Sequence, residues 1–560
     1  MSGHGHRGHG SWHWTAAVGA ALTARIAPRS HRLADVQWWR ANTARIQVEQ
    51  LRWLLRRASA TEFGRQHEFE KIAAINDPIA LIGAYRAAVP ISDWYGFRET
   101  IARMRECGEP NVLWPGKVRD FAQTSGTTAG DKYIPVSQEM LRSNYRASLD
   151  IFAYMHLRGI SLPRICSGRC LFLGGSSDLK ENEHGVRTGD LSGIVSPLIR
   201  WPISAIYSPG PRVALMDDWP AKIEVMAKLT LEQDIRFISG MPSWALVLMT
   251  RVLEMARGLG RPARCIYDVW PNLEIFVHGG VKYAPFESRI NEIVTGDREK
   301  DLPHRLELYP ASEAFVAIQD RPGDPGLRLC ADIGNFMEFV PLEWIDDPSP
   351  VALTCDQLER GQKYVVVLST CAGLWRYVLG DVVECDDVPD SLDDRVGTGP
   401  CRLRIVGRHR HFINAFGENI IVEHIENAVT EAARATGVEV GEFTAAPVYP
   451  GPDQKAGLEL AIEFNRPDSG QAVTAFADAF DRALKAQNVD YTTKRTNDLG
   501  MGPPTITVLP AGTFHRWMES RGKLGGQHKC PRCANNRELI ESVLSEVVRQ
   551  ESGRREPAQM

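Results

Sequence analysis

Short apolar runs that alternate with amphipathic helical stretches restrict the fold of this 560-residue chain more than any other feature of its sequence. Runs such as 170–173, 275–277, 306–308 and 364–368 lie close to Gly or Pro and are typical of buried strands. The stretches between them, such as 244–255, carry apolar residues at helical spacing. The alternation predicts an α/β fold in which layered sheets are covered by helices.

Composition excludes several classes of protein. Hydrophobic residues make up 43% of the chain and charged residues 24%, a balance that supports a large buried core and excludes wholesale disorder. The net charge of −4 does not attract the chain to nucleic acid or to anionic lipid. The nearest candidate for a membrane span, 15–22, is too short. We therefore expect no nucleic-acid partner and no membrane partner.

The 11 cysteines indicate the compartment. They are odd in number and scattered along the chain, which is typical of reduced thiols rather than of a disulfide framework. The weakly apolar stretch near the start follows a His-rich segment, whereas a secretion signal begins with Lys or Arg. We expect a cytoplasmic protein.

Three regions are predicted along the chain. Residues 1–30 are expected to form a flexible N-terminus, in which the His residues among glycines are a weaker candidate for binding a transition metal. Residues 31–406 are expected to form a large domain that opens with an amphipathic helix. The apolar face of that helix carries Ile46, Leu51, Leu54 and Leu55.

The pattern of predicted helices and strands in residues 407–560 differs from that of the α/β body upstream. These residues are expected to form a smaller α+β domain. The expected elements are helices at 422–433, around 476–484 and after 535, and strands at 458–464 and 505–509.

The segment 124–132 crowds hydroxyls, flexible glycines and a cation into nine residues. Its glycines permit close backbone approach to a ligand, and successive N–H groups can hold an anion. It differs from a Walker A loop, because Tyr133 follows Lys132 where Ser or Thr would stand. A polar surface turn fits the composition equally well. If the segment binds phosphate, its candidates are Thr124, Ser125, Gly126, Thr127, Thr128, Gly130 and Lys132.

Two further polar segments follow predicted strands. Tyr309, Ser312 and Glu313 stand at a strand end, where open α/β sheets bind ligands. Tyr309 could stack on a base, Ser312 could bond ribose or phosphate, and Glu313 could hold Mg²⁺ beside phosphate oxygens. Asp381 follows Gly380 and suits two ribose hydroxyls. Taken singly, Glu313 also fits a solvated or capping residue and Asp381 a turn residue.

Taken together and in this order, the three segments resemble the acyl- and aryl-adenylating (ANL) enzyme superfamily, and most closely its auxin-responsive, Gretchen Hagen branch of acyl-acid amido synthetases. The first segment resembles the superfamily's phosphate loop. Residues 309–313 are similar to the branch's Tyr-Ala-Ser-Ser-Glu signature, with Pro310 and Ala311 as variations. Arg376 and Asp381 fall in a segment similar to its Tyr-Arg-x-Gly-Asp signature. The resemblance implies ATP-binding roles for the first segment and for Tyr309, Ala311, Ser312 and Asp381.

The resemblance continues in the last third of the chain. Arg408 and residues 417–426 are similar to the superfamily's hinge and hairpin, which implies a nucleotide-binding role for Arg408. Asn419 stands where plant members often carry Lys. Residues 527–532 are similar to the branch's Lys-x-Pro-Arg segment, which implies that Lys529 is the catalytic lysine of adenylation.

Two other groups of residues have alternative interpretations. Cys530 and Cys533 have the spacing of half a zinc site, but a closed structural site needs four ligands, so incidental thiols are expected. His278 and Gly279 follow an apolar strand and are candidates for the acyl pocket. His278 fits a satisfied structural residue at least as well.

The resemblance implies an ATP- and Mg²⁺-dependent ligase that adenylates a small carboxylic acid and transfers the acyl group to an amino acid, forming an amide. Residues 31–406 would bind ATP and the acid, and 407–560 would form a mobile domain. Two alternatives remain open: an acyl-CoA ligase with the same adenylation step, and a catalytically inactive nucleotide-binding homologue. The sequence identifies neither the acid, the amino acid nor an oligomeric state.

Overall fold

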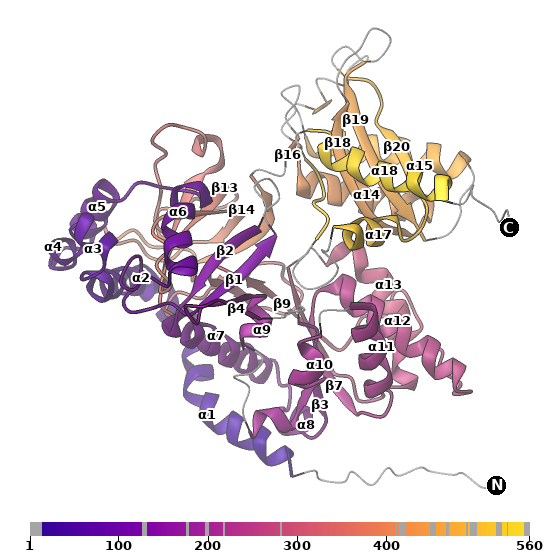
Figure 1. Ribbon diagram of the computed structural model, residues 1–560, viewed down its shortest axis with the longest axis horizontal. Coiled ribbons are helices and arrows are strands. Elements are labelled where there is room, and N and C mark those ends of the chain that lie inside the picture. Colours follow the sequence, from indigo (N-terminus) through magenta and orange to yellow (C-terminus); the bar gives the residue numbers. More distant parts are fainter. Residues whose placement is uncertain are drawn as a thin grey trace.

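The chain folds into a large body and a smaller lobe, which lies at the upper right of Figure 1. The computed structural model describes residues 14–125, 131–174, 179–195, 201–216, 219–280, 283–409, 412–413, 420–448, 455–465, 470–488, 491–492, 495, 501–521, 529–534 and 536–553. Within these residues, no helix combines the length and the apolar character that crossing a membrane would need.

The body is built around one sheet of eleven strands among the described residues. In spatial order the strands are β12 (Asn335–Pro341), β13 (Lys363–Thr370), β14 (Tyr377–Asp387), β15 (Arg402–Arg408), β11 (Leu327–Leu329), β10 (Phe315–Gln319), β9 (His304–Pro310), β8 (Ile275–Gly279), β7 (Ile235–Gly240), β3 (Arg169–Phe172) and β6 (Tyr207–Ser208). Neighbours from β12 to β9 are antiparallel, and those from β9 to β6 are parallel. The sheet therefore joins an antiparallel half to a parallel half at β9.

A second sheet of the body has the order β2 (Asp131–Val136), β1 (Asp120–Ser125), β5 (Arg187–Gly189) and β4 (Lys180–Glu181). Strands β1 and β2 form an antiparallel hairpin in which Ser125 lies opposite Asp131. The hairpin packs into the same hydrophobic cluster as Trp375 and Tyr377, just before and at the start of β14. The two strands of the hairpin are thereby fixed relative to β14.

Helices cover both sheets of the body. They are α1 (Ala16–Ala34), α2 (Val36–Ala58), α3 (Glu62–Gln66), α4 (Phe69–Ala73), α5 (Pro78–Ala88), α6 (Trp94–Glu106), α7 (Gln138–Leu157), α8 (Leu162–Cys166), α9 (Leu191–Val195), α10 (Pro211–Ala214), α11 (Trp219–Thr230), α12 (Pro242–Gly258) and α13 (Ala284–Thr295), with short 3₁₀ turns η2 (Ile203–Ala205), η3 (Ile266–Asp268) and η4 (Leu342–Trp344). Three buried clusters form the core: one under α1 and α7, one between α2–α6 and the hairpin, and one between the parallel strands and α11–α13.

The small lobe has a core of its own, formed by side chains between Ile413 and Cys533. Its sheet has the order β18 (Val440–Val448), β19 (Gly457–Phe464) and β20 (Thr505–Leu509), and a short pair β16 (Phe412–Ile413) and β17 (Ile420–Ile421) precedes it. Its helices are α14 (Val422–Thr436), α15 (Gly470–Gln487), α17 (Thr513–Ser520) and α18 (Glu538–Gly553). The apolar face of α15, which includes Phe476, Phe480 and Leu484, is fully buried in this core.

The α/β fold is confirmed, and so are the predicted strands that became β3, β8, β9, β13, β19 and β20. The predicted opening helix is α2, and all four of its named apolar residues are buried. Strand β18 was not predicted from the sequence. The predicted domain boundary at 407 falls within β15, whose last residue is Arg408.

The prediction of a flexible N-terminus is wrong for residues 16–30, which belong to α1. This helix packs on α7 and α8 and buries Leu22 and Ile26. A Cβ at Gly19 would lie only 2.4 Å from the carbonyl oxygen of Leu162, so α1 and α8 approach through small residues. Val18, Leu22 and Ile26 recur at helical spacing, so a local signal for this helix was present in the sequence. Residues 1–13 lie outside the described part.

Arg29 fastens α1 to the rest of the body. Its guanidinium donates to both carboxylate oxygens of Asp150 on α7, at 2.7 and 2.6 Å, and to Asp332 before β12, at 2.6 and 2.9 Å. The Asp150 side chain is only 5% exposed, so its charge depends on this partner.

We expect Arg29→Met to lower the free energy of unfolding by about 2–3 kcal/mol, because it leaves the Asp150 carboxylate buried without its cation. Urea unfolding followed by circular dichroism measures the change. Arg25→Met, on the exposed face of the same helix, should shift the midpoint little. Equal stability of the two variants would contradict the assigned role of Arg29.

Candidate active site

The two halves of the main sheet are brought together by a hydrogen bond. The hydroxyl of Tyr309 on β9 donates to Oδ2 of Asp381 on β14 at 2.7 Å, and both residues are buried. Strands β9 and β14 are separated in the sheet by β10, β11 and β15. In a flat sheet they would lie about 19 Å apart, beyond the reach of these side chains. The antiparallel half must therefore curl, and it places two candidate nucleotide-binding residues in one site.

A bulge in β14 presents Asp381. Val365 of β13 lies opposite Val382, whereas Val367 lies opposite Val378, so three residues of β14 face one residue of β13. Gly380 lies in this bulge with φ of +87°, a conformation that L side chains rarely adopt. The bulge re-aims the carboxylate that follows it.

The turn between β9 and β10 carries the next candidates. The N–H of Ala311 donates to the carbonyl of Ala314 at 2.9 Å and closes the turn. Ser312 is buried within the turn, and Glu313 is half-buried. Ala311, Ser312 and Glu313 are thus held directly beside Tyr309, as the sequence interpretation requires.

The predicted phosphate loop is the tip of the β1–β2 hairpin. Thr124 and Ser125 end β1, and Lys132 lies opposite Thr124 on β2. The connecting candidates Gly126, Thr127, Thr128 and Gly130 lie outside the described residues, and only the backbone is described for Thr124, Ser125 and Arg408. Arg408 is the register partner of Asp381 across β14 and β15.

Lys529 reaches from the small lobe to the body. A Cβ built on Gly280, the residue after β8, would lie 3.0 Å from Lys529 Nζ, and Met241 after β7 is also close to this point. Gly280 has φ of +83°. The ammonium therefore lies at the carboxyl ends of the parallel strands, where open α/β sheets bind ligands.

The segment that carries Lys529 is anchored along β18. The N–H of Ala445 donates to the carbonyl of Arg532, and the N–H of Ala534 donates to the carbonyl of Ala445. The Arg532 guanidinium pairs with Glu442 at 2.6 Å and lies 4.4 Å from the ring centre of Phe443. Because Arg532 is buried, these contacts fix the backbone three residues after Lys529.

Ion pairs from Arg298 and Lys363 join the lobe to the body. Arg298, just after α13, pairs with Glu439, and Lys363 at the start of β13 pairs with Glu423 at 3.9 Å. The Arg298 and Lys363 side chains are 40% and 31% exposed. Solvent-exposed pairs of this kind contribute little to stability.

His278 is buried in the core beside α13. Its ring stacks on Tyr283 with centroids 4.5 Å apart, and burial, helped by the charge of Arg305, lowers its pKa to about 3. Its Nδ1 has no hydrogen-bond partner within the described structure. A Cβ at Gly279 would meet the carbonyl oxygen of Leu308 at 2.6 Å, so Gly279 allows β8 and β9 to pack closely. The acyl-pocket roles of both residues stay predictions.

The remaining polar residues have structural explanations. Cys530 and Cys533 are free thiols in the core of the small lobe, and burial raises the pKa of both. The Arg376 side chain is buried and pairs with Glu338 at 2.9 Å, so it holds β14 to β12. Among the described residues, no group of three or more His, Cys, Asp or Glu side chains is arranged to hold a metal ion.

The arrangement suits chemistry on an anionic substrate that carries a ring and hydroxyl groups. Tyr309 of the buried Tyr–Asp pair lies near the carboxyl end of β9, and the lysine from the second lobe lies beside Gly280, just after the neighbouring strand β8. The spacing of residues in the sequence did not reveal the hydrogen bond between Tyr309 and Asp381. Nor did it reveal that Gly280 lies beside Lys529. A glycine pair directly after an apolar strand was the available signal for Gly280.

Comparison with known proteins finds one family along the chain. The GH3 family N-terminal domain matches residues 32–200, the GH3 family central domain matches 329–392, and the GH3 family C-terminal domain matches 423–538. Together these stretches make up more than half of the chain.

Curated relatives come from plants. "Indole-3-acetic acid-amido synthetase GH3.8" of Oryza sativa subsp. indica is 27% identical over 54% of this chain, which spans about half (50%) of that relative's length. "Probable indole-3-acetic acid-amido synthetase GH3.2" of Oryza sativa subsp. japonica is 22% identical over 95% of each chain.

Solved structures share the fold. "GH3.15 acyl acid amido synthetase" has a TM-score of 0.71 at 16% identity, over 94% of this chain and 96% of that one. A 2-hydroxyisobutyryl-CoA ligase in its postadenylation state has a TM-score of 0.54 at 14% identity, over 90% of this chain and 91% of that one.

We expect Tyr309→Phe to raise the KM for a bound nucleotide substrate about tenfold, because the buried Asp381 carboxylate loses a hydrogen-bond donor. Steady-state kinetics with ATP measures the effect. Tyr491→Phe is the matched control, since Tyr491 makes an equivalent 2.7 Å bond to Asp481 inside the small lobe. The control should leave the KM unchanged, and an equal KM in both variants would contradict the role of the bond.

We expect His278 to make the protein less stable in acid. Its folded pKa lies below the unfolded value of about 6.5, so the unfolded chain binds a proton first and stability falls as pH drops. Between pH 7.5 and 5.5, wild type should lose about 1 kcal/mol more than His278→Phe. Urea midpoints at both pH values test this, with the exposed His31→Phe as control. Parallel losses in wild type and His278→Phe would refute it.

Proposed function

Because this chain belongs to the GH3 family, we propose that it is an ATP-dependent acyl-acid amido synthetase, a ligase that adenylates a carboxylic acid and joins the acyl group to an amino acid. The curated relatives named above carry indole-3-acetic acid-amido synthetase names. A small organic acid and an amino acid are the proposed substrates here. The cytoplasmic location stays a prediction.

One observation carries the proposal. Tyr309 of the bonded pair Tyr309–Asp381 lies near the carboxyl end of β9 in the body, and the Lys529 ammonium of the lobe lies beside Gly280, just after the neighbouring strand β8. Adenylation needs groups that orient a nucleotide and a cation that faces the reacting phosphoryl group. These residues supply both.

In the proposed first step, a carboxylate oxygen of the acid attacks the α-phosphorus of ATP, and the bond to pyrophosphate breaks. Lys529 acts as a point charge on the transferring phosphoryl group. Tyr309 and Asp381 orient the adenine and the ribose. The hairpin tip with Lys132, the turn with Ala311 and Ser312, and Arg408 are the proposed phosphate and nucleotide contacts.

Mg²⁺ is a proposed cofactor whose protein ligand is Glu313. Magnesium is usually held by one or two carboxylates together with substrate phosphates, and a single half-buried carboxylate in the turn after Tyr309 fits that pattern. When bound, the ion would neutralise phosphate charge. Glu313 would then orient it toward the nucleotide.

In the proposed second step, the amine nitrogen of the amino acid attacks the acyl carbon, AMP leaves with the bridging oxygen, and the nitrogen gives up a proton. We propose that residues 407–560 move between the two steps. The ion pairs from Arg298 and Lys363 to the lobe are partly exposed, so breaking them costs little free energy. They would oppose such a movement only weakly.

An acyl-CoA ligase is the second candidate, supported by the fold shared with 2-hydroxyisobutyryl-CoA ligase. A panel of aryl, indolyl and fatty acids with ATP, offered either amino acids or coenzyme A, separates the candidates by mass spectrometry of the products. Amide products support the proposal, whereas thioesters without amides would overturn it. Absence of acid-dependent exchange of labelled pyrophosphate into ATP would indicate an inactive homologue.

We expect Lys529→Ala to slow the pyrophosphate exchange about a hundred- to a thousandfold, because a preorganised charge on the transferring phosphoryl group is lost. Lys485→Ala, a lysine on α15 of the same lobe that pairs with Asp481, should keep the wild-type rate. An unchanged rate in Lys529→Ala would show that another group supplies the charge.

A further inference from the structure

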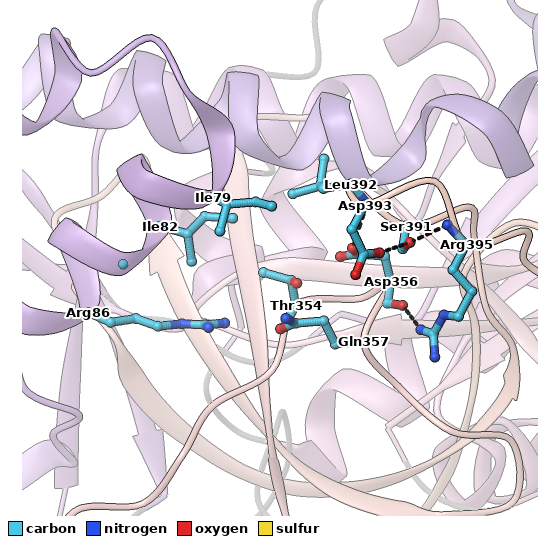
Figure 2. A pocket seen from close by; sticks show the side chains of 11 residues that line it. Ile79, Ile82, Arg86, Thr354, Asp356, Gln357, Ser391, Leu392, Asp393 and Arg395 are labelled. Carbon is cyan, nitrogen blue, oxygen red and sulfur yellow. Dashed lines mark hydrogen bonds between the residues drawn. The ribbon is translucent and has the colours of Figure 1, made fainter.

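A cavity of about 430 Å³ lies on the side of the body that carries α5, at the opposite end of Figure 1 from the small lobe. It is enclosed by α5, by the segment 354–357 and by the loop 391–395 (Figure 2). None of its lining residues belongs to the candidate active site. The lining consists of Ile79, Ile82, Gly83, Arg86, Thr354, Asp356, Gln357, Ser391, Leu392, Asp393 and Arg395.

One wall of the cavity is cationic. Arg86 donates through Nε to Glu338 at 2.8 Å, and the same carboxylate also receives Arg376. Two guanidinium groups therefore share one carboxylate, which leaves a net positive charge at this wall. The Nη2 atom of Arg86 is buried and has no hydrogen-bond partner within the described structure.

The facing wall is anionic. Asp356 is only 2% exposed; its Oδ2 accepts the N–H of Leu392 at 3.1 Å, whereas its Oδ1 is buried without a partner in the described residues. The guanidinium of Arg395 donates to the backbone carbonyl of Asp356. It makes no hydrogen bond to Oδ1 of the Asp356 carboxylate. Asp393 adds a second carboxylate, whose pKa is lowered by the hydroxyl of Ser391. Figure 2 shows Arg86 on one side of the cavity and both carboxylates on the other.

Apolar side chains line the space between these walls. Ile79, Ile82 and Leu392 lie along one side of it in Figure 2. Ile79 is 56% exposed. Gly83 on α5 opens the cavity further, because a Cβ there would meet no atom within 4 Å.

We propose that this cavity is a second binding site, which takes a free α-amino acid with an apolar side chain. The carboxylate of the ligand pairs with Arg86, its ammonium pairs with Asp356 Oδ1, and its side chain lies against Ile79 and Ile82. A buried polar atom without a partner is unfavourable, and the two charges of a zwitterion complement the two walls of the cavity. A simple anion would leave Asp356 unpaired, and a simple cation would leave Arg86 unpaired. The inference does not rest on the proposed function.

Calorimetric titration of the full-length protein with L-leucine, without ATP or any organic acid, tests the proposal. N-acetyl-L-leucine, which lacks the ammonium, and L-leucinamide, which lacks the carboxylate, should each bind at least tenfold more weakly than L-leucine. Binding of either probe as tight as that of L-leucine would overturn the zwitterion assignment.

Two variants localise the binding. Gly83→Leu adds a side chain at a position where a Cβ meets no atom within 4 Å, and it improves the helix propensity of α5, so the variant should fold. Asp356→Asn keeps an acceptor for the Leu392 N–H but places an amide group at the cavity. Both should weaken L-leucine binding at least tenfold, whereas Ala87→Leu, an exposed position of the same helix, should bind as wild type. Undiminished binding in Gly83→Leu, or no L-leucine binding in wild type, would overturn the proposal.

Discussion

The hydrogen bond between Tyr309 and Asp381 is the contact on which the geometry of the candidate site depends. It joins β9, the first parallel strand, to β14 in the antiparallel half, across a part of the sheet that must curl to allow it. The bulge at Gly380 contributes to the same contact, because it directs the carboxylate of Asp381 toward Tyr309. Two residues that are far apart in the strand order of the sheet thereby lie side by side.

The small lobe combines firm internal contacts with weak external ones. Arg532 is buried among Glu442, Glu426 and Phe443, so the segment after Lys529 is rigidly attached to β18. The ion pairs from Arg298 and Lys363 to the lobe are partly exposed and therefore weak. The proposed movement of the lobe would therefore leave the position of Lys529 within it unchanged.

The cavity beside α5 and the candidate active site lie in different parts of the body. Strands β12 and β13, whose central residues such as Phe339, Val366 and Val367 are completely buried, form an apolar wall behind β14. The shared carboxylate of Glu338 lies in the middle of β12, where it pairs with Arg86 of α5 and with Arg376. Arg376 directly precedes β14, five residues before Asp381. The cavity under α5 and the candidate active site are thus distinct places on one sheet.

The sequence by itself determined the local elements: β20 coincides with the predicted strand 505–509, and α2 and α15 bury the predicted apolar faces. Burial leaves a periodic trace in neighbouring residues, so such elements can be recognised locally. Ordered motifs also placed Tyr309, Asp381 and Lys529 among the site candidates. Only the tertiary structure decided that Tyr309 bonds Asp381, 72 positions away, and that Lys529 reaches Gly280. Those contacts depend on strand order, sheet curl and lobe placement, which no local pattern encodes.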